Sequence, residues 1–289
     1  MRVFSIDLDG KPFIEPVNIS RQFRVVFSTA MNYTENLGML DLAIYNLSNN
    51  TNIQANQSIV FRAGYDDTSQ AFQVIFQGRV TTVFKERDGA NIVTRVLCRT
   101  GTVADRGSID LTLGQNTTPT QALDAIGKTF GVPIEYQPEQ FKGENNAPHL
   151  RGFLLKGDIR HQLDSLGQQC GFTWAHDGTK VIIDKEGEKR TGIVQEVSLL
   201  TGLIGMPEAT SDNTGVFVNV TTKLNPALRI GGLFNLKSQY ATLNAGNMYL
   251  IPPQHGGNLD GEYKVMTISH EGDSWGEAWR TKVTGMKNG

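Results

Sequence analysis

The sequence repeats one nine-residue phrase near its opposite ends, VTTVFKERD at 80–88 and VMTISHEGD at 265–273. Four residues are identical in the two copies, and Val83 is replaced by Ile268. The identical pairs are Val80 and Val265, Thr82 and Thr267, Glu86 and Glu271, and Asp88 and Asp273. Continuing the alignment without a gap places Arg95 on Arg280. A strand-like phrase written twice in this way indicates that part of the chain is duplicated.

The segments before the two copies also follow a common order. YNLSNN (45–50) resembles TKLNPA (222–227) as a strand end, a leucine and a turn. NQSIVFRAGY (56–65) then resembles IGGLFNLKSQY (230–240) in its apolar pattern. Because the order agrees as well as the phrase, we predict one β domain present in two copies, with a different segment inserted between them.

The first of these domains has the pattern of short β-strands. Its apolar segments alternate or are β-branched and end at Gly, Asn or Asp, and Asp9-Gly10 is a strong hairpin signal. No segment has helical periodicity. About six or seven strands with closely spaced turn signals are typical of a barrel or sandwich. We therefore expect a mainly β protein with two similar β-barrel domains, 1–104 and 191–289.

The middle segment, 105–190, has a different pattern. Thr118-Pro119-Thr120-Gln121 is a capping box with proline at the first helical position, and Gly131 marks the end of that helix. Asp158 and Gly171 bracket a second helix in the same way. Short apolar strands precede and follow each helix. The pattern predicts an α/β module that separates the two β domains.

The two helices of this module are themselves similar. ALDAIGKTFG (122–131) aligns with QLDSLGQQCG (162–171), with Leu, Asp and both glycines shared. We predict two small β-α-β-like units, at about 105–141 and 150–184, side by side.

Three polar segments are predicted to connect these parts. KGENNAPHLRG at 142–152 has the composition of an exposed loop between the two small units. The charged DKEGEKRTG at 184–192 is predicted to be a linker to the second β domain. The long segment 240–262 contains two prolines and several glycines, and we interpret it as a loop available for interactions.

Composition excludes several classes of protein. The formal net charge is −2, so no strongly basic face is indicated for tight nucleic-acid binding. Neither a secretory signal nor an apolar run of the about 20 residues that a membrane helix needs is visible. Cys98 and Cys170 both lie among apolar residues, which favours two buried free thiols over a disulfide or a metal site. We expect a chain made and folded in a cytoplasm, without a membrane segment.

Candidate catalytic patterns in the sequence are weak. VFSIDLDGK resembles a phosphatase motif in which Asp7 would be the nucleophile and Asp9 the acid–base, but a strand follows it instead of a helix, so a hairpin turn is the preferred interpretation. The five histidines, at 149, 161, 176, 255 and 270, are scattered without metal-ligand spacing. Glu271 and Asp273 beside His270 suggest acid–base chemistry, yet Glu86 and Asp88 repeat the carboxylates without the histidine.

Tryptophan gives one further candidate. Trp174, Trp275 and Trp279 could form a ligand platform, although single tryptophans on strands more often pack in a core. From the residues we expect no catalytic, cofactor-binding or metal-binding site, no cofactor, and no enzyme activity. Two alternatives stay open. One is a carbohydrate- or receptor-binding β protein that uses the tryptophans and the 240–262 loop. The other is a cell-wall-degrading enzyme that uses Glu271 and Asp273.

The order of the motifs resembles a known family. IYNLSNNTNIQANQSIVFRAGY with IFQGRV, and later LNPALRIGG with GEYKVMTISHEGDSWGEAWRTKV, are similar to the baseplate hub proteins of contractile-tailed bacteriophages. That family is related to the hub portion of type VI secretion spikes and to late-control tail proteins. The resemblance covers the whole length, but its motifs are structural and carry no catalytic positions.

The resemblance implies a structural virion protein of the tail baseplate. A hub of this kind is a homotrimer in which two similar barrels per chain form a ring of six. It joins the tail tube to the central spike and lines the channel through which DNA passes without specific binding. The implied partners are the tail tube protein, the central spike protein, and the tape-measure and baseplate wedge proteins. The protein would be assembled in the host bacterial cytoplasm.

Overall fold

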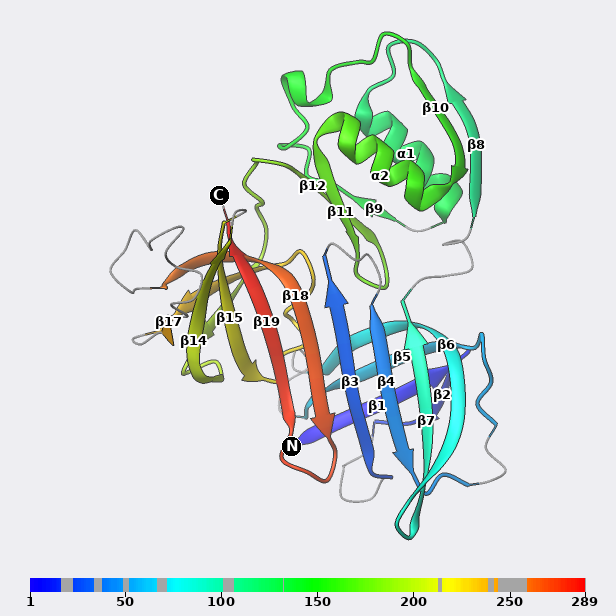
Figure 1. The fold of residues 1–289 in the computed structure, drawn as a ribbon, viewed down its shortest axis with the longest axis vertical. Helices are drawn as coiled ribbons and strands as arrows, with labels where there is room; N and C mark the ends of the chain where they lie inside the picture. The colour runs from blue at the N-terminus through cyan, green and yellow to red at the C-terminus, as the bar shows by residue number, and fades with distance from the viewer. Residues whose placement is uncertain are drawn as a thin grey trace.

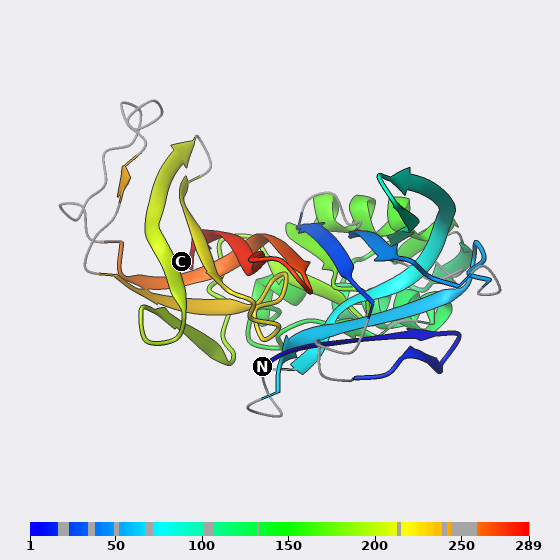
Figure 2. The same cartoon turned by 90° about the horizontal axis from the view of Figure 1, so that it is seen from below.

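The computed structural model describes residues 1–16, 23–33, 38–48, 52–66, 72–100, 107–131, 133–212, 215–238, 242–243 and 259–288. Strands account for 56% and helices for 12%, so the expected mainly β fold with an α/β insert is confirmed. The insert lies above two groups of strands that stand side by side (Figure 1, and from below Figure 2). Most of the predicted 240–262 loop lies outside the described residues.

The strands before the insert form one run. Their bounds are β1 Arg2–Leu8, β2 Lys11–Ile14, β3 Val25–Asn32, β4 Met39–Tyr45, β5 Ser58–Tyr65, β6 Phe72–Asp88 and β7 Asn91–Arg99. The predicted Asp9-Gly10 hairpin joins β1 to β2, and both turn residues have positive φ (49° and 74°), as a type I′ turn requires.

The strands after the insert form a second run. Their bounds are β13 Val194–Ser198, β14 Leu203–Asp212, β15 Gly215–Lys223, β16 Leu233–Lys237, β17 Thr242–Leu243, β18 Gly261–Asp273 and β19 Trp279–Lys287. β14 is interrupted by a register shift between Ile204 and Glu208 where it pairs with β15. The irregular stretch contains Pro207, which lacks an amide hydrogen for the ladder.

The insert contains the two predicted helices. Its elements are β8 Ser108–Leu113, α1 Pro119–Phe130, β9 Ile134–Glu135, the 3₁₀ turn η3 Gly143–Asn146, β10 Phe153–Asp158, α2 Ile159–Cys170, β11 Phe172–His176 and β12 Val181–Lys185. Both predicted caps are confirmed: Thr118 and Gln121 form the capping box of α1, and Asp158 accepts from two amides at the start of α2. Each helix ends at a glycine in the left-handed conformation, Gly131 or Gly171.

Two of the three strand pairings in the insert join the two predicted repeats, and the third, β11 with β12, lies within the second repeat. β10 pairs with β8 in an antiparallel two-stranded sheet, and β12 lies between β11 and β9 in a second sheet. Both helices pack into one core with Phe130, Phe141, Phe153, Leu163 and Ile183 among its buried members. The repeats are therefore folded into one unit, because neither helix alone can bury its apolar face.

The remaining strands form one continuous sheet. Its main path runs β17-β14-β15-β19-β18-β3-β4-β7-β6-β5-β1-β2, and β16 and β13 join beside β18. The strand count led us to expect closed barrels, but none of the described sheets closes into a barrel. The two groups of strands share their edge instead: β18 from one pairs with β3 from the other.

The sheet packs on two apolar cores, one for each group of strands. Each core also contains at least one residue from the other group of strands. The first core contains Phe27, Phe61 and also Trp279, which begins β19. The Trp279 ring lies edge-on to Phe27 at 5.3 Å, and its Nε1 donates to the Gly64 carbonyl at 3.3 Å. The second core contains Tyr33, just after β3. The cores are thus interlocked at the β3–β18 junction.

Candidate assembly interface

The repeated phrase forms the same local structure in both places. It lies on β6 and on β18, and each strand pairs in antiparallel register with the strand that follows it, β7 or β19. In both ladders the register shifts at one residue, between Val80 and Thr82 and between Val265 and Thr267. A bulge bends a strand and strengthens its twist at a defined place. The two copies therefore bend at the same position.

The hairpin loops after the two copies differ in length, which corrects the ungapped alignment. Asp88 pairs with Asn91, whereas the amide of Asp273 donates to the carbonyl of Ala278. The second loop is two residues longer, so Arg95 corresponds to Lys282 and not to Arg280. The ion pairs agree: Glu86 lies 3.3 Å from Arg95, and Glu271 lies 2.9 Å from Lys282.

The neighbouring strands also match. β6 belongs to the antiparallel order β5-β6-β7-β4-β3, and β18 belongs to the antiparallel order β16-β18-β19-β15-β14. The next strand differs, because β1 pairs with β5 antiparallel and β13 pairs with β16 parallel. In this comparison β14 is the counterpart of β3.

The outer edge of β18 is paired along the whole repeated phrase. Thr267–Asp273 lies antiparallel to β3, from Thr267 opposite Asn32 to Asp273 opposite Val26. Ile268, His270 and Gly272 are buried there. The His270 amide donates to Thr29 Oγ1 at 3.0 Å, and its Nδ1 lies 2.8 Å from Thr281 Oγ1. This junction is a backbone ladder with a buried polar core.

The solvent side of the shared sheet carries charges that are mutually paired. The Arg24 guanidinium contacts Asp273 at 2.7 Å, so the junction has an ion pair across it. Arg95 contacts Asp41 at 2.9 Å as well as Glu86. Arg280 contacts Glu271, which Lys282 also reaches. The charges of these four cations are therefore balanced by neighbouring carboxylates.

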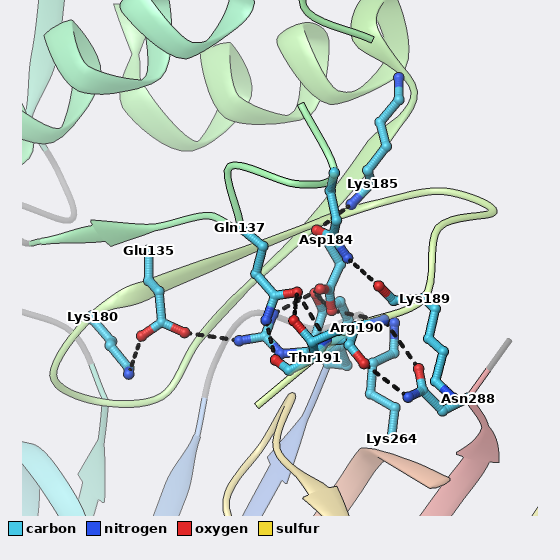
Figure 3. Close-up of polar contacts among 12 residues, drawn as sticks. Glu135, Gln137, Lys180, Asp184, Lys185, Lys189, Arg190, Thr191, Lys264 and Asn288 are labelled. Carbon is cyan, nitrogen blue, oxygen red and sulfur yellow. Dashed lines mark hydrogen bonds and ion pairs between the residues drawn. The ribbon is translucent and has the colours of Figure 1, made fainter. Parts of the chain in front are cut away.

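A second polar cluster fastens the insert to the shared sheet (Figure 3). Asp184 on β12 accepts from Arg190 at 2.7 Å and from the Tyr33 hydroxyl at 2.9 Å, and Lys264 on β18 lies 3.3 Å away. The Asp184 side chain is only 4% exposed and that of Arg190 8%. Asn288, just after β19, bonds both backbone groups of Arg190. The cluster thus joins the insert to strands from both ends of the chain.

This cluster corrects the prediction that 184–192 is a linker. Two of its charged residues, Asp184 and Arg190, are buried in the structure, and Arg190 also contacts Glu135 of β9 at 2.8 Å. Burial raises the pKa of the Asp184 carboxyl, but the charges of Lys264 and Arg190 and the hydrogen bonds to Asp184 outweigh it, so this pKa lies below its ordinary value. Burial also raises the pKa of Tyr33, whose hydroxyl donates to Asp184.

The phosphatase-like motif has structural contacts. Asp7 pairs with Arg62 across β1 and β5 at 2.5 Å, and Asp9 Oδ1 accepts from the Ser58 amide at 2.9 Å. Glu271 and Asp273 are likewise held by basic partners. The three tryptophans are not brought together as a platform: Trp174 is buried in the insert, Trp279 is buried in the first core, and Trp275 is 66% exposed.

His255 lies outside the described residues, and the described histidines and cysteines give one close pair. His149 Nε2 lies 3.9 Å from the Cys170 sulfur, at the edge of a shallow pocket beside α2. Burial raises the pKa of Cys170, which disfavours the thiolate that a nucleophile needs. Cys98 and Cys170 are both buried free thiols, as predicted. Among the residues that the structure describes, no three potential metal ligands lie together.

Sequence reasoning missed the residues that join the parts. They come from three distant segments, which hold Tyr33, the pair Asp184 and Arg190, and Lys264. In the sequence the three charged residues resemble ordinary surface residues. The one available signal was the unusual density of alternating charge at 184–190. This charge pattern suggests a solvent-exposed segment, because the sequence does not show which other residues cover it after folding.

Comparisons with known proteins agree with this architecture. A sequence model of the family described as baseplate hub gp41 matches residues 33–252. No curated protein sequence matches the chain. Among solved structures, the chain is similar to the 43 kDa tail protein of prophage MuSo2 from Shewanella oneidensis, with a TM-score of 0.63 and 13% identity over 99% of this chain and 98% of that one.

Two further structures show the same fold. A tail protein from Neisseria meningitidis MC58 matches with a TM-score of 0.61 and 9% identity, over 99% of this chain and 96% of that one. An E. coli component of the type VI secretion system, described as similar to T4 bacteriophage tail proteins gp27 and gp5, matches with a TM-score of 0.57 and 11% identity, over 98% and 77%.

This chain therefore shares its fold with phage tail proteins and with a component of a type VI secretion system. The chain belongs to the baseplate hub gp41 family. It is a structural component of a phage tail baseplate, and so of the virion. Within the described residues, neither helix has the length and apolar character needed to cross a membrane.

The buried cluster predicts a large effect for a small substitution. Asp184→Asn keeps the size of the side chain but leaves Arg190 and Lys264 without their buried counter-charge. We expect a loss of about 3 kcal/mol in the free energy of unfolding, measured by urea titration. Glu196→Gln, which removes an exposed pair with Lys237, is the control and should cause no measurable change. Equal unfolding curves for Asp184→Asn and the unchanged protein would contradict a stabilising role for the cluster.

The junction histidine predicts a pH dependence. Burial, with a smaller contribution from Arg229, lowers the pKa of His270 to about 3, whereas it titrates near 6.5 when unfolded. Below pH 6.5 His270 binds a proton in the unfolded chain but stays neutral in the folded chain. The free energy of unfolding is therefore highest above pH 6.5 and falls as the pH drops below it. Between pH 7 and pH 5 we expect a loss of about 2 kcal/mol.

The substitution His270→Gln tests this dependence. It removes the titrating group, so unfolding free energies measured at pH 7 and pH 5 should differ less than in the unchanged protein. The exposed His161→Gln should retain the full difference. If His270→Gln retained it as well, another group would be responsible for the acid sensitivity.

Proposed function

We propose that this chain is the homotrimeric hub of the baseplate, joining the tail tube to the central spike and lining the channel for DNA. The proposed units are the two similar β domains, 1–104 and 191–289, and the α/β module, 105–190, between them. The tube and spike proteins are the principal partners, with tape-measure and wedge proteins nearby. Assembly would take place in the host bacterial cytoplasm.

The observation that carries this proposal is the β3–β18 ladder. It joins two similarly ordered groups of strands head to tail within one chain, so the two groups use different edges at the junction. A heterologous contact of this type repeats from unit to unit and gives a closed ring when the rotation between units divides a full turn. Three chains would supply six such groups. The same trimer would present three copies of the insert on one side.

The charges on the solvent side of the shared sheet support the channel. A wall of unpaired lysine and arginine would retain DNA through phosphate contacts. Here Arg24, Arg95, Arg280 and Lys282 all contact carboxylates. If this face lines the channel, it lets DNA pass with little electrostatic retention.

The shape and mass of the particle test the proposal. Light scattering of the purified protein, alone and with its tube and spike partners, should give a species of three times 31.8 kDa. Negative-stain images of that species should show rings with six lobes and an open centre. A protein that stays monomeric under both conditions, or a compact trimer without a channel, would contradict it.

A further inference from the structure

We propose that the outer edge of β6, residues Thr82–Asp88, is the docking site for β14 of a second copy of this chain. The pairing would follow the register that β18 makes with β3 inside the chain. This inference rests on the proposed function and deepens it, because it assigns the strands that join one hub subunit to the next.

Among the described strands, none lies along the outer edge of Thr82–Asp88 on β6, whereas β3 covers the matching edge of β18. Within the described part of the chain, β5 pairs only with the first half of β6, from Phe72 to Arg79, and β7 pairs with the other side. No described strand pairs with the outer edge of Thr82–Asp88. Phe84 is 39% exposed on this segment. A long open edge with an exposed aromatic ring is a template for another strand.

The side chains of the two repeated phrases show the same contrast. Gly272 is buried against Phe27 and Trp279, and an added Cβ there would lie 2.5 Å from a Phe27 ring carbon. The matching residue of the first copy is Arg87, which is exposed. The position is glycine on β18, where β3 lies alongside, and a long charged residue on β6, where no described strand lies alongside.

The occupant follows from the counterpart strand. β18 is covered by β3, and β14 has the place of β3 in the second group of strands, next to β15 as β3 is next to β4. Where Phe27 faces Gly272, β14 has its register shift, with three residues, Gly205, Met206 and Pro207, in place of one. None of these three is aromatic, so the bulky Phe27 ring has no counterpart opposite Arg87.

The matching registers predict which residues meet. Ser269 lies opposite Ala30 on β18 and β3. The equivalent residues of the proposed junction are Phe84 on one chain and Thr210 on the next, with Glu86 opposite Glu208. The Arg95 guanidinium, 3.3 Å from Glu86, supplies a cation beside these two carboxylates.

The type of each pair also follows from the internal junction. The amide of Tyr33 donates to the carbonyl of its partner Met266, and the amide of Ser274 donates to its partner Val25. Bonded and non-bonded pairs alternate along an antiparallel ladder, so Ala30 and Ser269 form a non-bonded pair, in which side chains are closest. The same holds for Phe84 with Thr210 and for Glu86 with Glu208.

One short strand occupies part of the required edge in the single chain. β17 pairs with β14 at Glu208 and Ala209 in a parallel two-residue ladder. The incoming β6 would replace it with an antiparallel ladder that also covers Thr210 and the end of β14. Docking therefore includes the displacement of β17 from β14.

Paired cysteines test the junction and its register in the full-length chain. Four double variants combine Phe84→Cys or Glu86→Cys with Thr210→Cys or Glu208→Cys, under mild oxidation with copper phenanthroline. The matched combinations, Phe84 with Thr210 and Glu86 with Glu208, should form disulfides between chains. The crossed combinations should form them at least tenfold more slowly, because diagonal neighbours lie about 7–8 Å apart.

The chain contains its own control. Ala30→Cys with Ser269→Cys occupies the equivalent places of the internal junction and should close within one chain, as shown by loss of free thiol without a change of mass. Single cysteine variants give the background of random cross-linking. Native Cys98 and Cys170 are buried and remain in all variants.

Each other outcome overturns the inference in a distinguishable way. If light scattering shows the trimer and the internal pair closes, but neither matched pair cross-links, the subunits join elsewhere and the hub proposal stands. If the crossed pairs react as fast as the matched pairs, the register is wrong. If no variant and no unchanged protein assembles, both this junction and the proposed hub are wrong.

Discussion

The backbone ladder between β18 and β3 is the interaction on which the rest of the structure depends. It joins strands separated by most of the chain, and it makes one sheet from two groups of strands. Because the ladder holds the start of β19 beside the first group, Trp279 enters that group's core. The edge that would otherwise be open is covered by the same protein, which removes a site for uncontrolled association.

The ladder also determines where the insert can be attached. Tyr33 follows β3 and Lys264 lies on β18, so pairing of the two strands brings both side chains to Asp184. The buried charges tolerate this position only because each has a close partner. Assembly of the two β groups and fastening of the α/β module are therefore coupled through one small cluster, and the module has a defined orientation relative to the sheet.

Local features of this fold could be predicted from the sequence, whereas its long-range pairings could not. The Asp9-Gly10 turn and the helix caps at Thr118 and Asp158 depend on a few neighbouring residues, and all are confirmed. The ungapped match of Arg95 to Arg280 was wrong because a two-residue difference in a loop leaves the alternating pattern of both strands intact. The segment 184–192 was misread as a linker because charged residues that find partners after folding look like solvent-exposed ones. No pattern in β3 or β18 reveals that they pair with each other, or that the described sheets stay open.

The central claim is that both copies of the repeated phrase belong to equivalent junctions, one closed within the chain and one between chains. Amide hydrogen exchange followed peptide by peptide tests it most directly, because exchange reports whether a backbone edge is paired. In the monomer, peptides covering 265–273 should be protected and those covering 80–88 should exchange much faster. In the assembled particle both should be protected to a similar degree. Unchanged fast exchange of 80–88 after assembly would contradict the account.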